Sequence, residues 1–170
     1  MMVSTSQMLG KEILCGSVTT VARALSATLK GLVHFICHED VFKHMADDMA
    51  ELNLESDVEL IEVIVDELQV HMQARSRRAR SPQRRSVSLA LRHLHGALDE
   101  IHQALQNFRS HMEAHQQLWF SYYRAFDSAG HLRLLRLCKR RLDHHFDRLV
   151  KVHQIFVPPA PGSSMMLKTD

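Results

Sequence analysis

Glycine and proline are scarce in this sequence, with 6 glycines and 4 prolines among 170 residues. Hairpins and tight turns depend on both residue types, so their scarcity argues against a β-rich fold and favours helices. The cysteines, Cys15, Cys37 and Cys138, are odd in number and widely spaced, so they imply no disulfide framework. Each lies within an apolar pattern, so we interpret all three as small buried side chains in a reducing compartment.

Long uncharged apolar runs are missing as well. A membrane-spanning helix needs about 18 or more such residues, and Lys11, Glu12, Arg23 and Lys30 interrupt the apolar pattern near the N-terminus. We therefore expect neither a transmembrane segment nor a secretory signal peptide. Residues 1–36 hold one acid and many Ser and Thr residues, as mitochondrial presequences do, but their length and heptad pattern favour a bundle helix.

Motifs for catalysis and for metal or cofactor binding are absent from the sequence. It contains no GxSxG, no glycine-rich phosphate loop, no CxxC and no HExxH. Thirteen histidines occur, including His34 with His38 and His111 with His115, each pair four residues apart. Zinc needs three or four ligands that converge from more than one element, and no such set is evident. We expect no enzyme activity, no metal and no cofactor.

The composition instead suits one folded domain. Hydrophobic residues make up 45% of the chain and the net charge is only +2, which is too apolar and too weakly charged for a disordered chain. We expect a single domain over residues 1–157, followed by Pro158 and Pro159, because proline cannot continue a helix. Residues 158–170 show no periodicity and are expected to form a disordered tail.

Apolar residues at spacings of three and four predict helices in the first half of the chain. The first spans residues 10–36 and has a broad apolar face. A short helix follows over residues 42–52, and Asn53 interrupts it. Ser56 and Glu59 form a capping box, which predicts the start of the next helix. The apolar residues of that helix are Val58, Ile61, Ile64 or Val65, Leu68 and Met72.

The second half holds a sustained heptad pattern of the coiled-coil type. Two interleaved series with a period of seven predict one helix over residues 87–126, about 60 Å long. The series are Leu91, Leu98, Leu105, Met112, Trp119 and Phe126, and Val87, Leu94, Ile101, Phe108, His115 and Tyr122. We expect Ser128 to cap a last helix that ends near Phe156. Together these elements predict an all-α, antiparallel helical bundle of four to five helices, with the long heptad-patterned helix as its spine.

Residues 74–86, ARSRRARSPQRRS, interrupt these patterns and predict an exposed loop. Its six arginines are Arg75, Arg77, Arg78, Arg80, Arg84 and Arg85. Four interpretations remain: a linker regulated by kinases, a nuclear import signal, a nucleic-acid site and an inert solvated loop. A nucleic-acid site is disfavoured because no aromatic residue is interleaved with the arginines. For the regulated linker, the candidate phosphosites are Ser81, Ser86 and Ser88.

Charge is unevenly distributed despite the near-neutral total. Residues 39–67 hold eleven acids against one base, and residues 124–151 hold eight bases against three acids. Either the two regions are neighbours in the bundle, or each faces a partner of opposite charge. Exposed ion pairs contribute only about 0–1 kcal/mol each, so they bias the packing order rather than supply the stability. We favour the arrangement as neighbours.

Residues 42–49, FKHMADDM, place two apolar residues three apart before a small residue, Asp, a second acid and a further apolar residue. This pattern resembles the BH3 motif of the Bcl-2 family, which implies binding as an amphipathic helix in a hydrophobic groove. The residues concerned are Phe42, Met45, Ala46, Asp47, Asp48 and Met49. The resemblance covers eight residues, with Phe42 in place of the usual leucine and His38 in place of an apolar anchor. The alternative is a bundle helix whose Phe and Met side chains are core.

Five of the ten aromatic residues cluster at the predicted end of the long helix: Trp119, Phe120, Tyr122, Tyr123 and Phe126. Aromatic residues are enriched among interface anchors, so this cluster is either the densest part of the core or a partner-binding surface.

The sequence favours a non-catalytic protein–protein interaction module, an adaptor or an assembly subunit, which binds a protein partner or itself through its helices. The alternative is a helical regulator of cell death in peripheral contact with a membrane or lipid, acting through residues 10–52. A helical-bundle enzyme is disfavoured because acids and histidines do not converge in the sequence. We expect a cytoplasmic location, with the nucleus as the alternative for an import signal and the mitochondrion for the membrane-associated regulator.

Overall fold

The computed structural model describes residues 5–74, 82–118 and 125–156, and the side chains of residues 15–71, 85–118 and 125–154. Every regular element in these residues is a helix, which confirms the all-α prediction. In chain order the elements are α1 (Thr5–His38), the 3-10 turn η1 (Lys43–Met45), α2 (Ala46–Glu51), α3 (Leu54–Ala74), α4 (Pro82–Gln116) and α5 (Ala129–Phe156).

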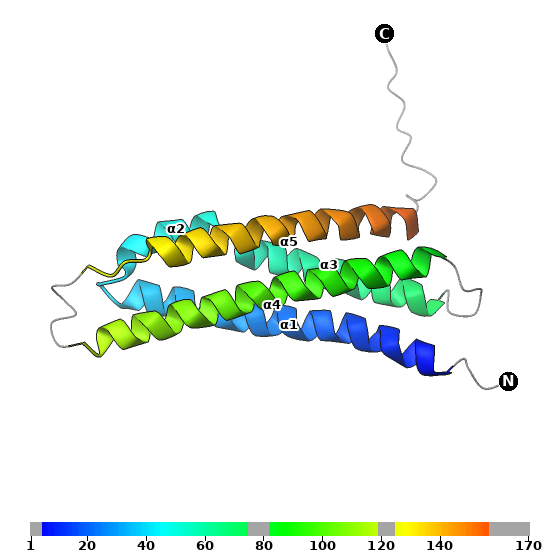
Figure 1. Cartoon of the computed structure of the whole chain (residues 1–170), viewed down its shortest axis with the longest axis horizontal. Coiled ribbons are helices and arrows are strands. Elements are labelled where there is room, and N and C mark those ends of the chain that lie inside the picture. Colours follow the sequence, from blue (N-terminus) through cyan, green and yellow to red (C-terminus); the bar gives the residue numbers. More distant parts are fainter. Residues whose placement is uncertain (1–4, 75–81, 119–124, 157–170) are drawn as a thin grey trace, which may run out of the picture.

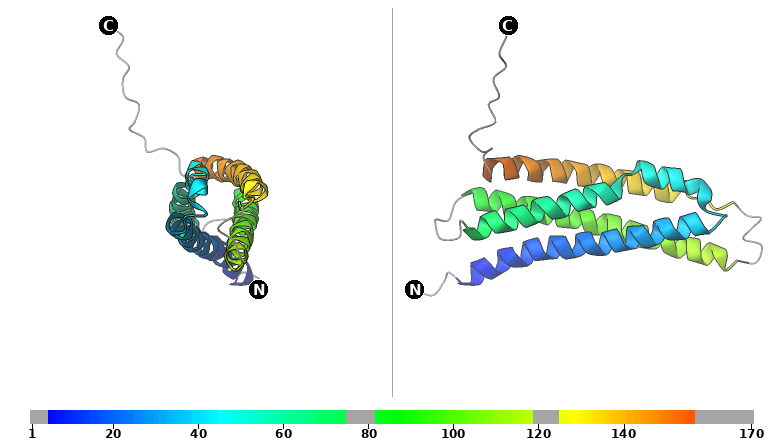
Figure 2. Two further views of the ribbon diagram at one scale, coloured as in Figure 1. Left: turned by 90° about the vertical axis from the view of Figure 1, so that its left-hand side faces the viewer. Right: turned by 180° about the vertical axis from the view of Figure 1, so that it is seen from behind.

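The four long helices form a bundle of two antiparallel hairpins that lie side by side (Figure 1). One hairpin is α1 with α3, and the other is α4 with α5. Across the two hairpins, α1 runs parallel to α4 and α3 runs parallel to α5 (Figures 1 and 2). A hydrogen bond of 3.0 Å between the Thr28 hydroxyl and His102 Nε2 marks the parallel pair of α1 and α4. The predicted antiparallel bundle is confirmed, and the parallel contact between hairpins is an additional feature.

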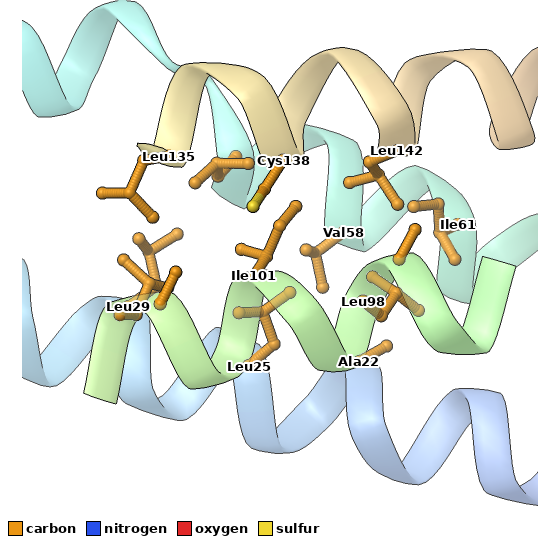
Figure 3. Packing of buried hydrophobic residues seen from close by; sticks show 14 of the residues in the cluster. Ala22, Leu25, Leu29, Val58, Ile61, Leu98, Ile101, Leu135, Cys138 and Leu142 are labelled. Atoms are coloured by element: carbon orange, nitrogen blue, oxygen red, sulfur yellow. The ribbon is translucent and has the colours of Figure 1, made fainter. Parts of the chain in front are cut away.

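The apolar sides of the helices meet in one continuous core. Figure 3 shows a section in which Leu25 of α1, Val58 of α3 and Ile101 of α4 extend into the shared interior, where Cys138 and Leu142 of α5 complete the packing. All five side chains are buried. Full burial of a Leu, Ile or Val side chain contributes roughly 1.5–3 kcal/mol. The helices are therefore held by this core rather than by helix propensity alone.

The end of α4 differs from the prediction. Both heptad series are buried as far as Met112, but the helix ends at Gln116 instead of residue 126. The Leu118 amide donates to the His115 carbonyl, three residues back, so the last turn tightens before the chain leaves the helix. Phe126 then packs against the core from a segment without regular structure. The apolar spacing continues beyond the helix because Phe126, although outside the helix, is half-buried against the core.

The start of α4 also corrects the sequence analysis. The helix begins at Pro82, so residues 82–86, which were predicted as loop, are helical. Proline suits the first position of a helix because its missing amide has no partner there and its φ is already helical. Residues 75–81, the rest of the predicted arginine loop, lie outside the described residues, as does the predicted tail over 158–170.

The boundary between α2 and α3 is set by Asn53. It has a φ of 48°, a left-handed conformation that Asn tolerates better than most residues, and this confirms the predicted interruption. Its carbonyl accepts the Asp57 amide at 3.3 Å. Because α3 already begins at Leu54, the capping box predicted at Ser56 and Glu59 is wrong as a helix start. At α5, Ser128 does precede the helix, but the side chain that caps it is Asp127, which accepts the Ala129 amide at 3.1 Å.

The acidic and basic regions are neighbours, as predicted. Two ion pairs join the acidic segments to α5, Asp48 with Arg136 and Asp57 with Lys139, and Glu67 lies 3.3 Å from His153, which completes a third pair when its imidazole is protonated. They lie on the parallel seam between the two hairpins, where the acids of α2 and α3 face the bases of α5. The opposite charges therefore favour this packing order among the helices.

Candidate interaction surfaces

The outer side of α3 is apolar as well as charged. Its inner side packs in the core, yet Leu60, Val63 and Val70 remain 48%, 55% and 64% exposed. Spacings of three and seven place these three side chains along one stripe of the helix. A single exposed apolar residue is ordinary, whereas three along one stripe mark a candidate contact surface.

Five acids border this stripe, and three of them have partners within the chain. The pairs are Glu55 with Lys30 at 3.3 Å, Glu62 with Arg23 at 4.0 Å, and Glu67 with His153 at 3.3 Å. The other two acids, Glu59 and Asp66, are exposed, and no described side chain forms an ion pair with them. We call Glu59, Leu60, Val63, Asp66 and Val70 the acidic face.

The outer side of α5 has the same construction with the opposite charge. Leu134 and Leu137 are each 45% exposed. Arg133 and Arg140 are exposed beside them, and neither forms an ion pair with a described side chain. The other arginines of this stretch are occupied: Arg136 pairs with Asp48, and Arg141 pairs with Glu100 at 2.9 Å. We call Arg133, Leu134, Leu137 and Arg140 the basic face.

A partly buried ion-pair network fixes how α3 and α5 sit relative to each other. Lys139 Nζ lies 2.8 Å from Asp57 on α3 and 2.6 Å from Asp143 on its own helix, and its side chain is 19% exposed. Burial lowers the pKa of Lys139, but the hydrogen bonds to Asp143 and Asp57 outweigh it, so the pKa is raised overall. Lys139 therefore stays charged and holds the two helices, and hence the two outer faces, in a fixed relation.

Histidine pairs line the antiparallel seam between α4 and α5. His111 Nδ1 and His131 Nε2 are 2.9 Å apart, and the rings of His93 and His145 are 5.3 Å apart. In a hydrogen bond between two imidazoles one ring donates and the other accepts, so at least one ring of the first pair is neutral. No three metal-ligating side chains converge in the described parts of the chain. These histidine rings contact each other between α4 and α5.

The burial lowers the pKa of the two histidines on α5. For His131 desolvation is the main cause, and the neighbouring His111 adds to it while Asp127 opposes it. For His145 desolvation is again the main cause. His93, His144 and Arg148 lower the pKa of His145 further, and Glu100 opposes them. Neutral imidazoles are thus part of the packed seam.

The residues of the BH3-like stretch face the core of the bundle. Phe42 and Met45 are fully buried and Met49 is 6% exposed. The ring of Phe42 lies 5.6 Å from that of Phe35 and 5.3 Å from that of Phe126. The stretch is also divided between η1 and a six-residue α2, so it is not one continuous α-helix. Of its polar members, Asp47 is exposed, Ala46 is half-buried, and Asp48 pairs with Arg136.

Most of the predicted aromatic cluster and the arginine loop fall outside the described residues. This applies to Trp119, Phe120, Tyr122 and Tyr123, and to Arg75, Arg77, Arg78, Arg80 and Ser81. Phe126 is half-buried, with its ring 5.3 Å from His115 and 6.1 Å from Phe108, so this member of the cluster contributes to the core. Arg84 belongs to α4, where Arg85 and Ser86 are exposed and Ser88 is half-buried.

The cysteines are not all buried, contrary to the sequence analysis. Cys15 and Cys138 are buried, whereas Cys37 is exposed near the end of α1. Burial raises the pKa of both buried thiols, and the nearby carboxylates of Asp66 and Glu100 add to this for Cys15 and Cys138 respectively. The buried thiols are therefore protonated and unreactive, as core side chains.

Sequence reasoning missed both outer faces, although one signal was present. Residues 59–67 read ELIEVIVDE and residues 133–141 read RLLRLCKRR. The two segments share their spacing of leucine or valine and of charge, but the sign of the charge is inverted. The structure adds that both segments are helical and that their apolar pairs are exposed.

Comparison with known proteins adds no assignment. No family model matches the chain, and neither the curated proteins nor the solved structures contain a significant match. Across the described residues, no helix combines the length and apolar character that crossing a membrane requires.

Proposed function

We propose that this protein is a non-catalytic interaction module, an adaptor or an assembly subunit, that binds a protein partner through the acidic face of α3. The observation that carries the proposal is the exposure of Leu60, Val63 and Val70 beside two acids that form no ion pair with a described side chain. Such a surface combines apolar area for affinity with charge for orientation.

The chemistry of the acidic face specifies the kind of partner. An amphipathic helix with an apolar stripe and basic flanks would cover the three apolar side chains and pair with Glu59 and Asp66. Full burial of a Val or Leu contributes roughly 1.5–3 kcal/mol. Because these three exposed side chains have only about half to two thirds of their surface left to bury, each offers about half of that. The charges contribute mainly to the association rate and to the choice of partner.

The rest of the bundle holds α3 in place, so that the acidic face is a rigid surface. The core occupies the inner sides of all four long helices. Lys139 holds α5 against α3 through its ion pair with Asp57, so the helix that carries the acidic face is fixed in position. A rigid surface loses little conformational entropy on binding, which favours affinity for a given contact area.

Control by phosphorylation is a finer part of the proposal and concerns the start of α4. Ser86 is exposed, follows the exposed Arg85, and is more accessible than the half-buried Ser88. A phosphate there would add about two negative charges beside the arginine-rich segment. A basophilic kinase should label the wild type and not Ser86→Ala, as measured by intact mass. Equal labelling of both proteins would place the modified residue elsewhere.

The membrane-associated alternative is not favoured by any contact. It would act through the apolar residues of α1 and of the BH3-like stretch. Among those whose side chains are described, Leu25, Leu32 and Phe42 are buried in the core, whereas Val33 is 40% exposed. Groove binding by Phe42, Met45 and Met49 would require this part of the bundle to open.

The test compares two pairs of exposed apolar residues. Leu60→Ser with Val63→Ser removes the centre of the acidic face, and Val33→Ser with Leu89→Ser removes apolar side chains of 40% and 52% exposure elsewhere. Both variants should keep the helical circular dichroism of the wild type. Affinity purification with mass spectrometry should find a partner that the wild type and the control capture and the face variant loses. Once that partner is purified, it should protect the amides of residues 59–70 from hydrogen exchange. Equal capture by both variants would contradict the proposal.

A further inference from the structure

The acidic face and the basic face are complementary halves of one contact. On α3, Glu59 precedes Leu60, and Asp66 follows Val63 by three positions. On α5, Arg133 precedes Leu134, and Arg140 follows Leu137 by three positions. Both apolar pairs are exposed, and in both helices the two flanking charges lack an ion pair with any described side chain.

Contacts within the chain account for the other charges of the two segments. Glu62 pairs with Arg23, Glu67 with His153, Arg136 with Asp48, and Arg141 with Glu100. Within these two segments, the charges that form no ion pair with a described side chain are two acids seven residues apart on α3 and two bases seven residues apart on α5. Two matched spacings of opposite sign are what a direct contact between the helices requires.

The two faces cannot meet within one copy. α3 and α5 already contact each other through a different side, where Asp57 pairs with Lys139. Glu59 and Asp66 lie toward the α1 side of α3, because they are three or four residues from Glu55 and Glu62, which pair with Lys30 and Arg23 of α1. Glu59 and Asp66 therefore point away from α5 of their own bundle.

We propose that the chain self-associates, with the acidic face of one copy packed antiparallel against the basic face of a second copy. The inference rests on the proposed function and names the partner that occupies the acidic face. In the antiparallel direction Leu60 lies opposite Leu137 and Val63 lies opposite Leu134. Glu59, which precedes the apolar pair of α3, then lies beside Arg140, which follows the apolar pair of α5. In the same way Asp66 lies beside Arg133. In a parallel pairing the flanking charges lie on opposite edges of the contact and do not meet.

The contact is small and its charges are exposed. One helix face against another covers less than the roughly 1,200 Å² typical of stable complexes, so the association is transient and depends on concentration. Salt weakens it, because exposed charges are screened over about 10 Å at 0.1 M ionic strength.

The test is charge inversion on each face, measured by sedimentation velocity and light scattering of the full chain at low salt. Glu59→Arg with Asp66→Arg makes both faces basic, and Arg133→Glu with Arg140→Glu makes both acidic. Each variant alone should be monomeric, with the dissociation constant raised about tenfold or more by like charges. An equimolar mixture of the two should associate again, and so should the variant that carries all four changes. The control, Asp47→Arg with Glu51→Arg, inverts two exposed acids of α2 and should associate like the wild type.

Two results would overturn the inference. One is a wild type that remains monomeric at every accessible concentration at low salt. The other is a wild type that associates while the mixture of inverted variants does not, which assigns the association to another surface. Neither result removes the proposed function, since a different partner lost from the Leu60→Ser and Val63→Ser variant would still identify the acidic face as a docking surface.

Discussion

Mild acidification should destabilise the bundle along the seam between α4 and α5. His131 and His145 are neutral in the folded protein at pH 7, because burial lowers their pKa below the ordinary value. On unfolding, both imidazoles return to water and regain an ordinary pKa near 6.5. The unfolded state therefore binds protons at a pH where the folded state does not.

The sign and size of the effect follow from proton linkage. The stability due to the two neutral histidines is fully present above pH 6.5. It is lost as the pH falls through 6.5 toward their lowered folded-state pKa values, since the unfolded chain then holds more protons. Each histidine can change the free energy of unfolding by at most about 1.4 kcal/mol per pH unit in that window. The two together can change it by at most about 3 kcal/mol per pH unit.

The assay is urea unfolding followed by circular dichroism, at constant ionic strength between pH 7.5 and pH 5.5. The double variant His131→Gln with His145→Gln cannot take up these protons. Its free energy of unfolding should depend less steeply on pH than that of the wild type, whatever its absolute stability. The control is Leu89→Ala, which changes an exposed side chain without a titratable group and should keep the slope of the wild type. Equal slopes for the wild type and the His131/His145 variant would refute the reasoning.

Two further substitutions test the packing and the backbone. Leu98→Ala should lower the free energy of unfolding by about 2–5 kcal/mol, because Leu98 is fully buried. Leu89→Ala, at a 52% exposed position on the same helix, should cost no more than about 0.5 kcal/mol, and similar losses for both would contradict the core assignment. Asn53→Ala should cost about 1 kcal/mol because of the φ of 48°, whereas Asn53→Gly should be tolerated, so matching thermal melts of these two variants would count against that conformation.

Apolar periodicity predicted the long helices because each has one side in the core. Val58, Ile61, Leu68 and either Ile64 or Val65 were expected on one side of their helix. Val58, Ile61, Val65 and Leu68 are buried, and Ile64 is half-buried. The neighbourhood of acidic and basic regions was also predictable, since opposite charges bias the packing order. The relative direction of the two hairpins was not predictable, because apolar periodicity does not determine which helix sides face each other.

The helix ends were predicted less well, for a physical reason in each case. The heptad spacing predicted a helix to residue 126. Phe126 does pack against the core, but it lies outside the helix, so its apolar character did not indicate helical structure there. The run of arginines suggested a loop through residue 86, although Pro82 suits the first turn of a helix. Near α3, the signal at Ser56 competed with Asn53, and the left-handed conformation of Asn53 sets the boundary.

The outer faces were hidden by the number of apolar residues in α3. Leu60, Ile61, Val63, Ile64 and Val65 follow one another so closely that the helix looks apolar on most sides. Only the packing of α3 against α1 and α5 separates the buried residues from the exposed ones. In the BH3-like stretch, the packing of the helices shows that the apolar residues are buried in the core instead of exposed for a partner.

The pairing of two hairpins has a consequence for how the chain can be divided. Each hairpin consists of helices that are close in sequence, whereas contacts between hairpins, such as that of Thr28 with His102, join residues 74 apart. Local contacts form faster than distant ones, so α1 with α3 and α4 with α5 are expected to assemble first and then dock. A chain cut between α3 and α4 retains both hairpins and every side-chain contact described between them. The two halves, expressed as separate polypeptides, should therefore recombine into the bundle, which would make this fold a natural scaffold for fragment complementation.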